Sequence, residues 1–402
     1  MLFRSNMRWF LFCYWYEPDA PSDPVGLVRL WALARQLSQR GDSVTVFPPR
    51  YRSSLLQRGF LVAPIPLLPW SVLRPISYAI LSFVVSFVRA CWSKPDVVYY
   101  RWMDSPHPLL FARLFGAQCI CEVNGEPVPP WCASGLRSRM THTLAAFALR
   151  HCDRVVVLTD GLRSLVQSQY GVSPDRVILL PSGSDTEVFR PKEMSLCRQE
   201  EQLDPACQYI GFVGSFYRYQ GLATLLEAFA RIHARRPSTR LLMIGEGEQA
   251  AALLAQATQR GLSSWITWAG RVEYTRVPTW IGAMDVCVAP FCGDRGETSP
   301  VKLFDYLACG RPVVASAIPS VTPLFSRANG VVLVQPDQID ALADAVLDLL
   351  ARPDEAGRLG REGREFVEQR YGWDAIVRTL RDLVRQIVQD DHDRHRLVVN
   401  NK

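Results

Sequence analysis

The sequence has little histidine and no cysteine pair at the spacing of a zinc site. It contains six histidines among 402 residues, none at ligand spacing from a cysteine pair, and no C-x-x-C. A zinc site is therefore not expected. The 11 cysteines are odd in number and scattered, which indicates free, buried thiols in a reducing compartment.

Long apolar runs and clustered charge are also absent. The apolar run near the N-terminus is followed by no small-residue cleavage site, so a first strand over Arg8–Tyr16 is the better interpretation than a signal peptide. The stretch from Pro75 to Val88 is nearly free of charge, but its 14 residues fall short of the roughly 20 that span a bilayer. It predicts a helix, either in the core or at a membrane surface. The net charge of +6 comes from scattered basic residues, so no nucleic-acid partner is expected.

What the sequence does contain is a regular alternation of short apolar strands with amphipathic helices. This pattern predicts an α/β protein with parallel sheets. Its length and a polar, aperiodic stretch after Phe189 predict two Rossmann-like domains that face a central cleft. The predicted parts are an N-terminal domain (1–190), a linker (191–207), a C-terminal domain (208–370), a helix that packs back on the first domain (371–390) and a tail (391–402).

The loop after the strand VCVAPF carries the most chemistry. A helix is predicted to start near Ser299 or Pro300, residue types suited to an N-cap and a first turn. Its unpaired amides and positive dipole end suit a diphosphate, and Lys302 adds a full charge one turn in. Glu297 before the helix and Asp305 on it could bind sugar hydroxyls. The simpler interpretation is a capped helix with an acidic flank.

Glu297, Asp305 and the following LACGRPVVA resemble the donor-site signature of retaining family-4 (group 1) glycosyltransferases. Four further segments resemble the family in the expected order: ICEVNGEP, PSGSDTEVFRP, GFVGSFYRYQGLATLLEAF and LLMIGEGEQ. The resemblance implies the glycosyltransferase B fold, a nucleotide sugar bound mainly by the C-terminal domain, and no metal.

The resemblance also implies roles for individual residues. Glu297 would contact the donor sugar, Asp305 the ribose, and Arg218 or Lys302 the leaving diphosphate, because Ser215 and Gln220 stand where the family often has Arg and Lys. The implied catalytic residues are Glu297, Arg218 and Lys302; the alternative for Arg218 is an ordinary solvated loop residue. The implied donor-binding residues are Gly214, Ser215, Gln220, Gly245, Glu246, Gly247, Ser299, Pro300, Val301 and Asp305.

The acceptor-side candidates lie in the first domain. They are Gly26 in the first loop, Asp104 and His107 after the strand DVVYYR, and Asn124 in the V-N-G turn. His107 is either a general acid-base group or an ordinary surface histidine. Asn124 either binds the donor sugar or suits a left-handed turn.

These features predict a hexosyltransferase-type enzyme (EC 2.4) of bacterial cell-envelope or exopolysaccharide synthesis. Its donor would be a UDP- or GDP-type nucleotide sugar, its acceptor a glycan or lipid-linked glycan, and it would need no cofactor. A cytoplasmic location, with peripheral contact to the inner face of the membrane, fits the composition. A sugar-nucleotide epimerase of the same fold and a non-catalytic partner in glycan assembly remain the alternatives.

Overall fold

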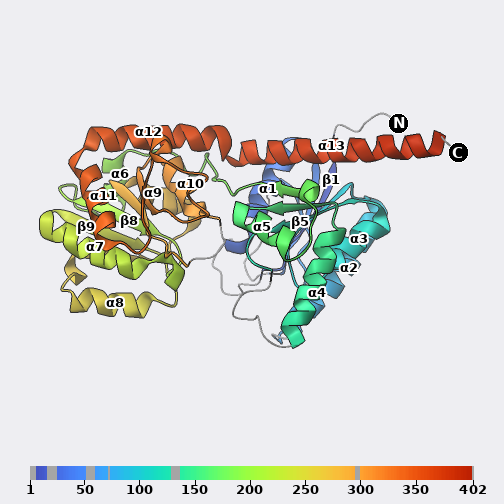
Figure 1. The fold of residues 1–402 in the computed structure, drawn as a ribbon, viewed down its shortest axis with the longest axis horizontal. Helices are drawn as coiled ribbons and strands as arrows, with labels where there is room; N and C mark the ends of the chain where they lie inside the picture. The colour runs from blue at the N-terminus through green and yellow to red at the C-terminus, as the bar shows by residue number, and fades with distance from the viewer. Residues whose placement is uncertain are drawn as a thin grey trace. The chain divides into compact units, whose positions relative to one another are not determined.

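The chain folds into two compact units. The computed structural model describes residues 6–15, 25–50, 59–70, 73–127, 136–294 and 299–400. Unit 1 comprises Met1–Pro181 and Ile376–Lys402, and unit 2 comprises Ser182–Ala375. The chain therefore leaves unit 1 once and returns to it near its end (Figure 1).

Unit 1 is built on a parallel sheet with the strand order β3-β2-β1-β4-β5-β6-β7. The strands are β1 (Arg8–Phe12), β2 (Ser43–Phe47), β3 (Leu61–Val62), β4 (Val97–Arg101), β5 (Gln118–Val123), β6 (Arg154–Val157) and β7 (Val177–Leu179). The helices are α1 (Val28–Gln39), α2 (Arg74–Trp92), α3 (His107–Phe115), α4 (Leu136–His151) and α5 (Asp160–Ser168), followed at the end of the chain by α13 (Trp373–Asn400).

Strands of unit 1 are apolar on both faces, as a sheet covered by helices on both sides requires. On β1, Phe10 and Phe12 join one core cluster with buried residues of α2, α3, α4 and α5. Trp9 and Leu11 alternate with them and are also fully buried. Cys119 and Cys121 belong to the same cluster, so they share one face of β5 as their spacing predicts.

The helix α13 is tied to unit 1 by a buried ion pair. The Arg381 guanidinium donates from Nε and Nη2 to the two carboxylate oxygens of Asp42, each at 2.7 Å. Asp42 is fully buried and also accepts bonds from the Met7 amide and the Trp9 indole. This carboxylate therefore joins β1, the turn before β2 and α13.

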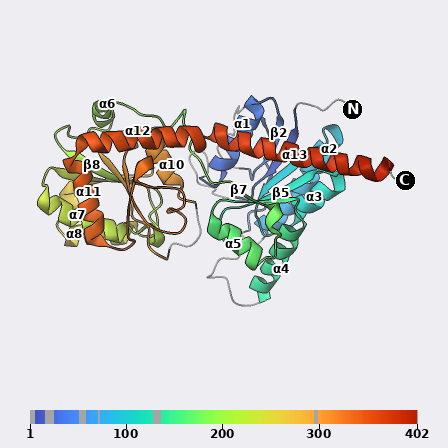
Figure 2. The same cartoon turned by 45° about the horizontal axis from the view of Figure 1, so that its top comes forward.

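Unit 2 is a second parallel sheet, in the order β10-β9-β8-β11-β12-β13. Its strands are β8 (Gln208–Val213), β9 (Thr239–Ile244), β10 (Ile266–Gly270), β11 (Val286–Ala289), β12 (Val313–Ser316) and β13 (Val331–Val334). Its helices are α6 (Met194–Glu200), α7 (Leu222–Arg235), α8 (Ala250–Gln259), α9 (Val277–Gly282), α10 (Val301–Ala308), α11 (Ile339–Ala351) and α12 (Pro353–Arg370). Figure 2, which turns the same ribbon, labels β8 and the helices α6, α7, α8, α10, α11 and α12.

Side chains of successive strand residues in unit 2 enter two separate cores. Leu242 and Ile244 of β9 pack with α9 and α10, whereas Leu241 and Met243 pack with α7, α8 and α11. This alternation has the period of two that a strand imposes. Both faces of the sheet are therefore covered by helices. A ligand of this unit is expected at the loops that follow the strands.

The structure differs from the sequence prediction at several boundaries. The predicted linker 191–207 contains α6, whose Arg198 forms an ion pair with Asp285, so this polar stretch is packed into unit 2. The predicted tail 391–402 continues α13 as far as Asn400. The first strand ends at Phe12, before the predicted Tyr16, and the helix predicted over 75–88 is the longer α2.

Candidate functional sites in the two units

The loops at the carboxyl ends of the unit 2 strands meet the start of α10. Helix α10 begins at Val301, with Pro300 in the N-cap position and no side-chain cap, so Ser299 does not fill the cap that the sequence predicts. Ser299 and Pro300 are buried next to it. Amides in the first turn of such a helix point outward and favour an anion. Glu297, the predicted sugar contact, lies outside the described residues.

Lys302 is the cation at this helix start. Its Nζ donates to Oε1 of the buried Gln220 and lies 3.9 Å from the ring centroid of Phe212 and 5.2 Å from that of Phe291. A Cβ added to Gly214 would lie 3.0 Å from the same Nζ. The side chain is half-buried, so its charge is less screened by water than a surface lysine's would be.

Three glycines shape the neighbouring loops. Gly214, Gly245 and Gly247 all have positive φ. A Cβ on Gly245 would lie 2.0 Å from the Gly214 carbonyl oxygen, and one on Gly247 would lie 2.6 Å from the Phe216 amide nitrogen. The two loops are joined by backbone bonds, since Phe216 N donates to Glu246 O at 2.7 Å. Only glycine permits this close approach of backbone to backbone.

Arg218 is placed differently from Lys302. Its guanidinium pairs with Asp294 at 2.5 Å, and the two side chains are 73% and 58% exposed. Ser215 and Glu246 are exposed as well. Of the two cations that the sequence offers for a leaving diphosphate, Lys302 is therefore the half-buried one, in the first turn of α10, and Arg218 is a solvated residue in an ion pair.

Asp305 of α10 lies against the segment that follows β7. Its Oδ1 accepts a hydrogen bond from the Ser184 hydroxyl at 2.6 Å. Burial raises the pKa of Asp305 to about 7, the Ser184 bond opposes this, and nearby Asp185 adds to it. The carboxyl group thus exchanges its proton near neutral pH, and it already has one protein partner where a ribose hydroxyl was predicted.

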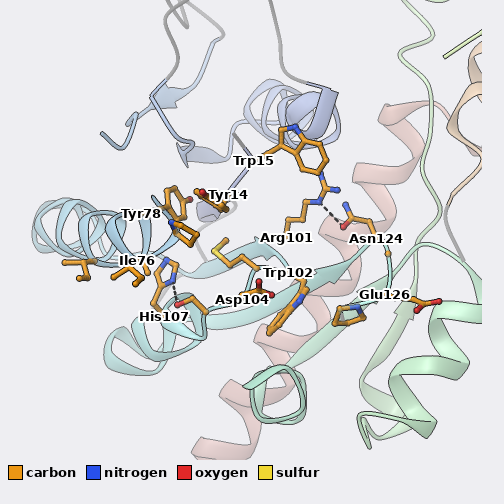
Figure 3. Close-up of a pocket in the computed structure, with 17 residues that line it drawn as sticks. Tyr14, Trp15, Ile76, Tyr78, Arg101, Trp102, Asp104, His107, Asn124 and Glu126 are labelled. Atoms are coloured by element: carbon orange, nitrogen blue, oxygen red, sulfur yellow. Dashed lines mark hydrogen bonds between the residues drawn. The ribbon is translucent and has the colours of Figure 1, made fainter. Parts of the chain in front are cut away.

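Unit 1 contains a cavity of about 620 Å³ at the ends of β4 and β5. Figure 3 shows aromatic side chains on its walls, with Tyr14 and Tyr78 near α2 and Trp15 above Arg101. Three of the four predicted acceptor-side residues line it: Asp104, His107 and Asn124. An apolar cavity with a few polar groups is the usual form of a small-molecule site.

Arg101 is the cavity's central cation, and sequence reasoning did not identify it. It donates from Nε to Asn124 Oδ1 at 2.9 Å and from Nη1 to the Gly26 carbonyl at 2.8 Å, and it lies 4.9 Å from the Trp15 ring centroid. Gly26, the fourth predicted residue, thus acts through its backbone. The sequence feature that could have identified Arg101 is its place at the carboxyl end of the apolar strand β4, where ligands of parallel sheets bind.

A buried network holds Asn124 in place. Its amide nitrogen donates to Glu122 Oε1 at 3.2 Å, and the other oxygen of Glu122 pairs with Arg29 at 2.6 Å and accepts from Tyr99. Burial raises the pKa of Tyr99 and the charge of Glu122 raises it further, so the phenol stays protonated and donates. Since Arg101 bonds to Asn124, the network also fixes the cation.

His107 is a buried residue at the start of α3, and the surface alternative is wrong. Its Nε2 lies 2.9 Å from the Ser82 hydroxyl and its Nδ1 3.0 Å from that of Ser105. Burial lowers the pKa of His107 to about 4, so the ring is neutral at pH 7. In the neutral ring one nitrogen donates and the other accepts, so the two serines hold the ring between α2 and the residues that precede α3.

Comparison with known proteins assigns a family model to each unit. Residues 28–188 match Glycosyltransferase Family 4, and residues 207–352 match Glycosyl transferases group 1. A D-inositol 3-phosphate glycosyltransferase of Catenulispora acidiphila is 27% identical over 247 residues. That alignment covers 59% of this chain and 57% of the relative, so the chain spans little more than half of that protein's length.

Two solved structures share the fold over nearly the whole chain. Sucrose-phosphate synthase of Thermosynechococcus elongatus has a TM-score of 0.77 at 18% identity and covers 95% of this chain and 99% of its own. The Anabaena protein HepE in complex with UDP has a TM-score of 0.74 at 16% identity, with 94% and 100% covered.

Proposed function

Because the chain belongs to the family-4, group 1 glycosyltransferases and has their B fold, we propose that it transfers a sugar from a nucleoside-diphosphate sugar to an acceptor hydroxyl. The acceptor is a glycan or a lipid-linked glycan of a bacterial envelope or exported polysaccharide. The anomeric configuration is retained. The reaction takes place on the cytoplasmic side, where nucleotide sugars are made.

The observation that carries this proposal is the half-buried Lys302 at the start of α10, against the Gly214 loop. In the reaction, the bond from the anomeric carbon to the diphosphate oxygen breaks and a bond to the acceptor oxygen forms. The acceptor proton leaves with the nucleoside diphosphate. Lys302 and the α10 amides stabilise the charge that develops on the diphosphate, a kind of interaction that is often the largest catalytic contribution. No divalent metal is needed for that step, so activity is expected to persist in a chelator.

The cavity of unit 1 is the proposed acceptor site. Arg101 gives it one fixed cation, and Trp15 and Trp102 provide flat apolar surfaces for a sugar ring. Both Asp104 and Asn124 line the cavity, where the carboxylate can accept hydrogen bonds from sugar hydroxyls and the amide can accept or donate them. His107 positions α3 and α2 and transfers no proton.

Release of nucleoside diphosphate tests the proposal. UDP- and GDP-sugars are incubated with the chain, with and without a glycan acceptor, and a bound donor is detected by thermal shift. UDP-sugars come first because HepE holds UDP. Acceptor-dependent release, with a product of unchanged anomeric configuration by NMR, is expected. Interconversion of the sugar nucleotide without an acceptor would favour an epimerase. If no nucleotide binds, the non-catalytic partner is the better account.

A further inference from the structure

Helix α2 is amphipathic in the reverse of the usual sense. Its inner face buries the serines Ser77, Ser82 and Ser86, together with Tyr78 and Ala90. These side chains have defined partners: the Ser82 hydroxyl lies 2.9 Å from Nε2 of the buried His107, and Tyr78 donates to the Phe47 carbonyl at 2.5 Å. These polar contacts fix the rotation of the helix. Leu81, Phe83 and Val85 pack partly against the core, and the remaining large apolar side chains of the helix are exposed.

The outward side chains form a stripe along the whole helix, here called the α2 stripe. Its members are Ile76, Ile80, Val84, Phe87, Val88 and Trp92, and each is at least 42% exposed. Their spacing of three and four residues places them on one face, and a 19-residue helix is about 28 Å long. Contiguous apolar surface of this kind marks an interaction site in soluble proteins.

The neighbouring helix α3 widens the stripe. Leu110 and Leu114 are 53% and 60% exposed. The two helices pack together through aromatic pairs, since the ring centroids of Phe87 and Phe115 lie 5.5 Å apart. The apolar surface therefore extends over two helices of unit 1.

Charge around the stripe selects the kind of partner. The sequences of α2 and α3 contain no Asp or Glu, and the basic residues near the carboxyl end of α2 are Arg89 and Lys94, with Arg113 on α3. Arg113 is already paired with Asp153. A second copy of the stripe would bring like charges together, whereas a bilayer with anionic headgroups complements both the cations and the apolar side chains.

The helix is long and apolar enough to cross a membrane, but its inner face argues against this. Crossing would remove Tyr78 and Ser82 from the core of unit 1 and expose their polar groups to lipid. We propose that the α2 stripe docks unit 1 on an anionic bilayer, with α2 lying in the plane of the interface. Trp92, 85% exposed at the helix end, suits the headgroup level.

The stripe is continuous with the cavity of unit 1. Ile76 and Ile80 belong to both. A lipid-linked acceptor would therefore reach the cavity from the membrane surface while its chain stays among the lipids. This last step rests on the proposed function, whereas the docking itself does not.

Vesicle flotation tests the docking. The full chain is mixed with phosphatidylcholine vesicles, with or without phosphatidylglycerol, and the floating fraction is measured. The variant Val84→Glu/Val88→Glu places two charges on the stripe at positions that do not line the cavity. Leu254→Glu is the matched control, an exposed leucine on α8 of unit 2. Circular dichroism and thermal melting verify that each variant folds.

The unmodified chain and the control are expected to float with phosphatidylglycerol vesicles, and the double variant at least tenfold less. Equal binding to both lipid compositions would overturn the role of Arg89 and Lys94. The docking would be overturned if the double variant floated as much as the unmodified chain, or if the unmodified chain did not float at all. A dimer in solution that the double variant converts to a monomer would assign the stripe to a second copy. Donor binding by thermal shift is recorded in parallel, so that failure of the proposed function is recognised separately.

Discussion

Replacing Lys302 with methionine removes one positive charge at the start of α10 and keeps most of the apolar stem. The ammonium group lies over the rings of Phe212 and Phe291, and a methionine side chain can maintain these contacts. The cation–π contribution to stability is about 1 kcal/mol at such a site, so the variant is expected to fold. The change therefore removes the charge and the hydrogen bond to Gln220 and keeps the apolar packing.

The expected loss of rate follows from the position of the charge. Two unit charges about 4 Å apart interact with about 4 kcal/mol at an effective dielectric constant of about 20, which suits a half-buried lysine. Loss of one preorganised donor to a developing anion typically lowers kcat by about 100- to 1,000-fold. We expect Lys302→Met to fall in that range, with a smaller effect on KM. Arg218→Ala is the comparison: its side chain is 73% exposed and paired with Asp294, so we expect less than about a tenfold loss.

Initial rates of nucleoside diphosphate release, measured over a range of donor concentrations, check both values. The thermal midpoint of each variant shows whether it is folded. A folded Lys302→Met enzyme with more than about a fifth of the unmodified kcat would refute the assignment of the diphosphate to this helix start. A larger loss for Arg218→Ala than for Lys302→Met would transfer the role to Arg218.

Three further changes test the fold around the sites. Gly221→Ala should destabilise unit 2 in urea by more than about 2 kcal/mol, because φ is +69° and a Cβ would lie 1.8 Å from the Pro290 carbonyl oxygen; an unchanged midpoint would contradict this. Asp305 has a pKa raised by burial to about 7, so the folded chain holds a proton that the unfolded chain releases above about pH 4. Its stability contribution therefore falls as pH rises from about 4 to about 7, and Asp305→Asn should flatten the decline in urea midpoint between pH 5 and pH 8. Arg381→Ala leaves the buried Asp42 carboxylate without its cation and should cost about 3–5 kcal/mol in urea unfolding; a cost below about 1 kcal/mol would show that the pair contributes little.

The parallel sheets could be predicted because they depend on local patterns. Strand segments such as WFLFC and LLMI are apolar at every position, and both of their faces are buried. The glycine turn at 245–247 was equally visible, since close backbone approach requires glycine whatever surrounds it. Segment boundaries were less predictable. The polar, aperiodic stretch 191–207 predicts a linker, and the contact that packs it into unit 2, Arg198 with Asp285, joins residues 87 positions apart.

The surroundings of the candidate site residues were harder still to predict, because they are set by contacts between residues far apart in the sequence. Lys302 meets Gln220, and Asp305 meets Ser184, across 82 and 121 positions. No periodicity in the sequence encodes these pairs. The orientation of α2 was hidden for another reason: serines are rarely the buried face of a helix, so the pattern of Ile and Val suggests the opposite side. The bonds of Ser82 to His107 and of Tyr78 to the Phe47 carbonyl show which face is inside.

The return of α13 to unit 1 affects how the protein is made. The acid Asp42 is synthesised early, but its partner Arg381 leaves the ribosome after all of unit 2. Until then unit 1 has a buried carboxylate without a cation, and its folding has to wait or proceed incompletely. A deletion that removes Arg381 would therefore destabilise unit 1, although the cavity of that unit is formed by residues from the first third of the chain.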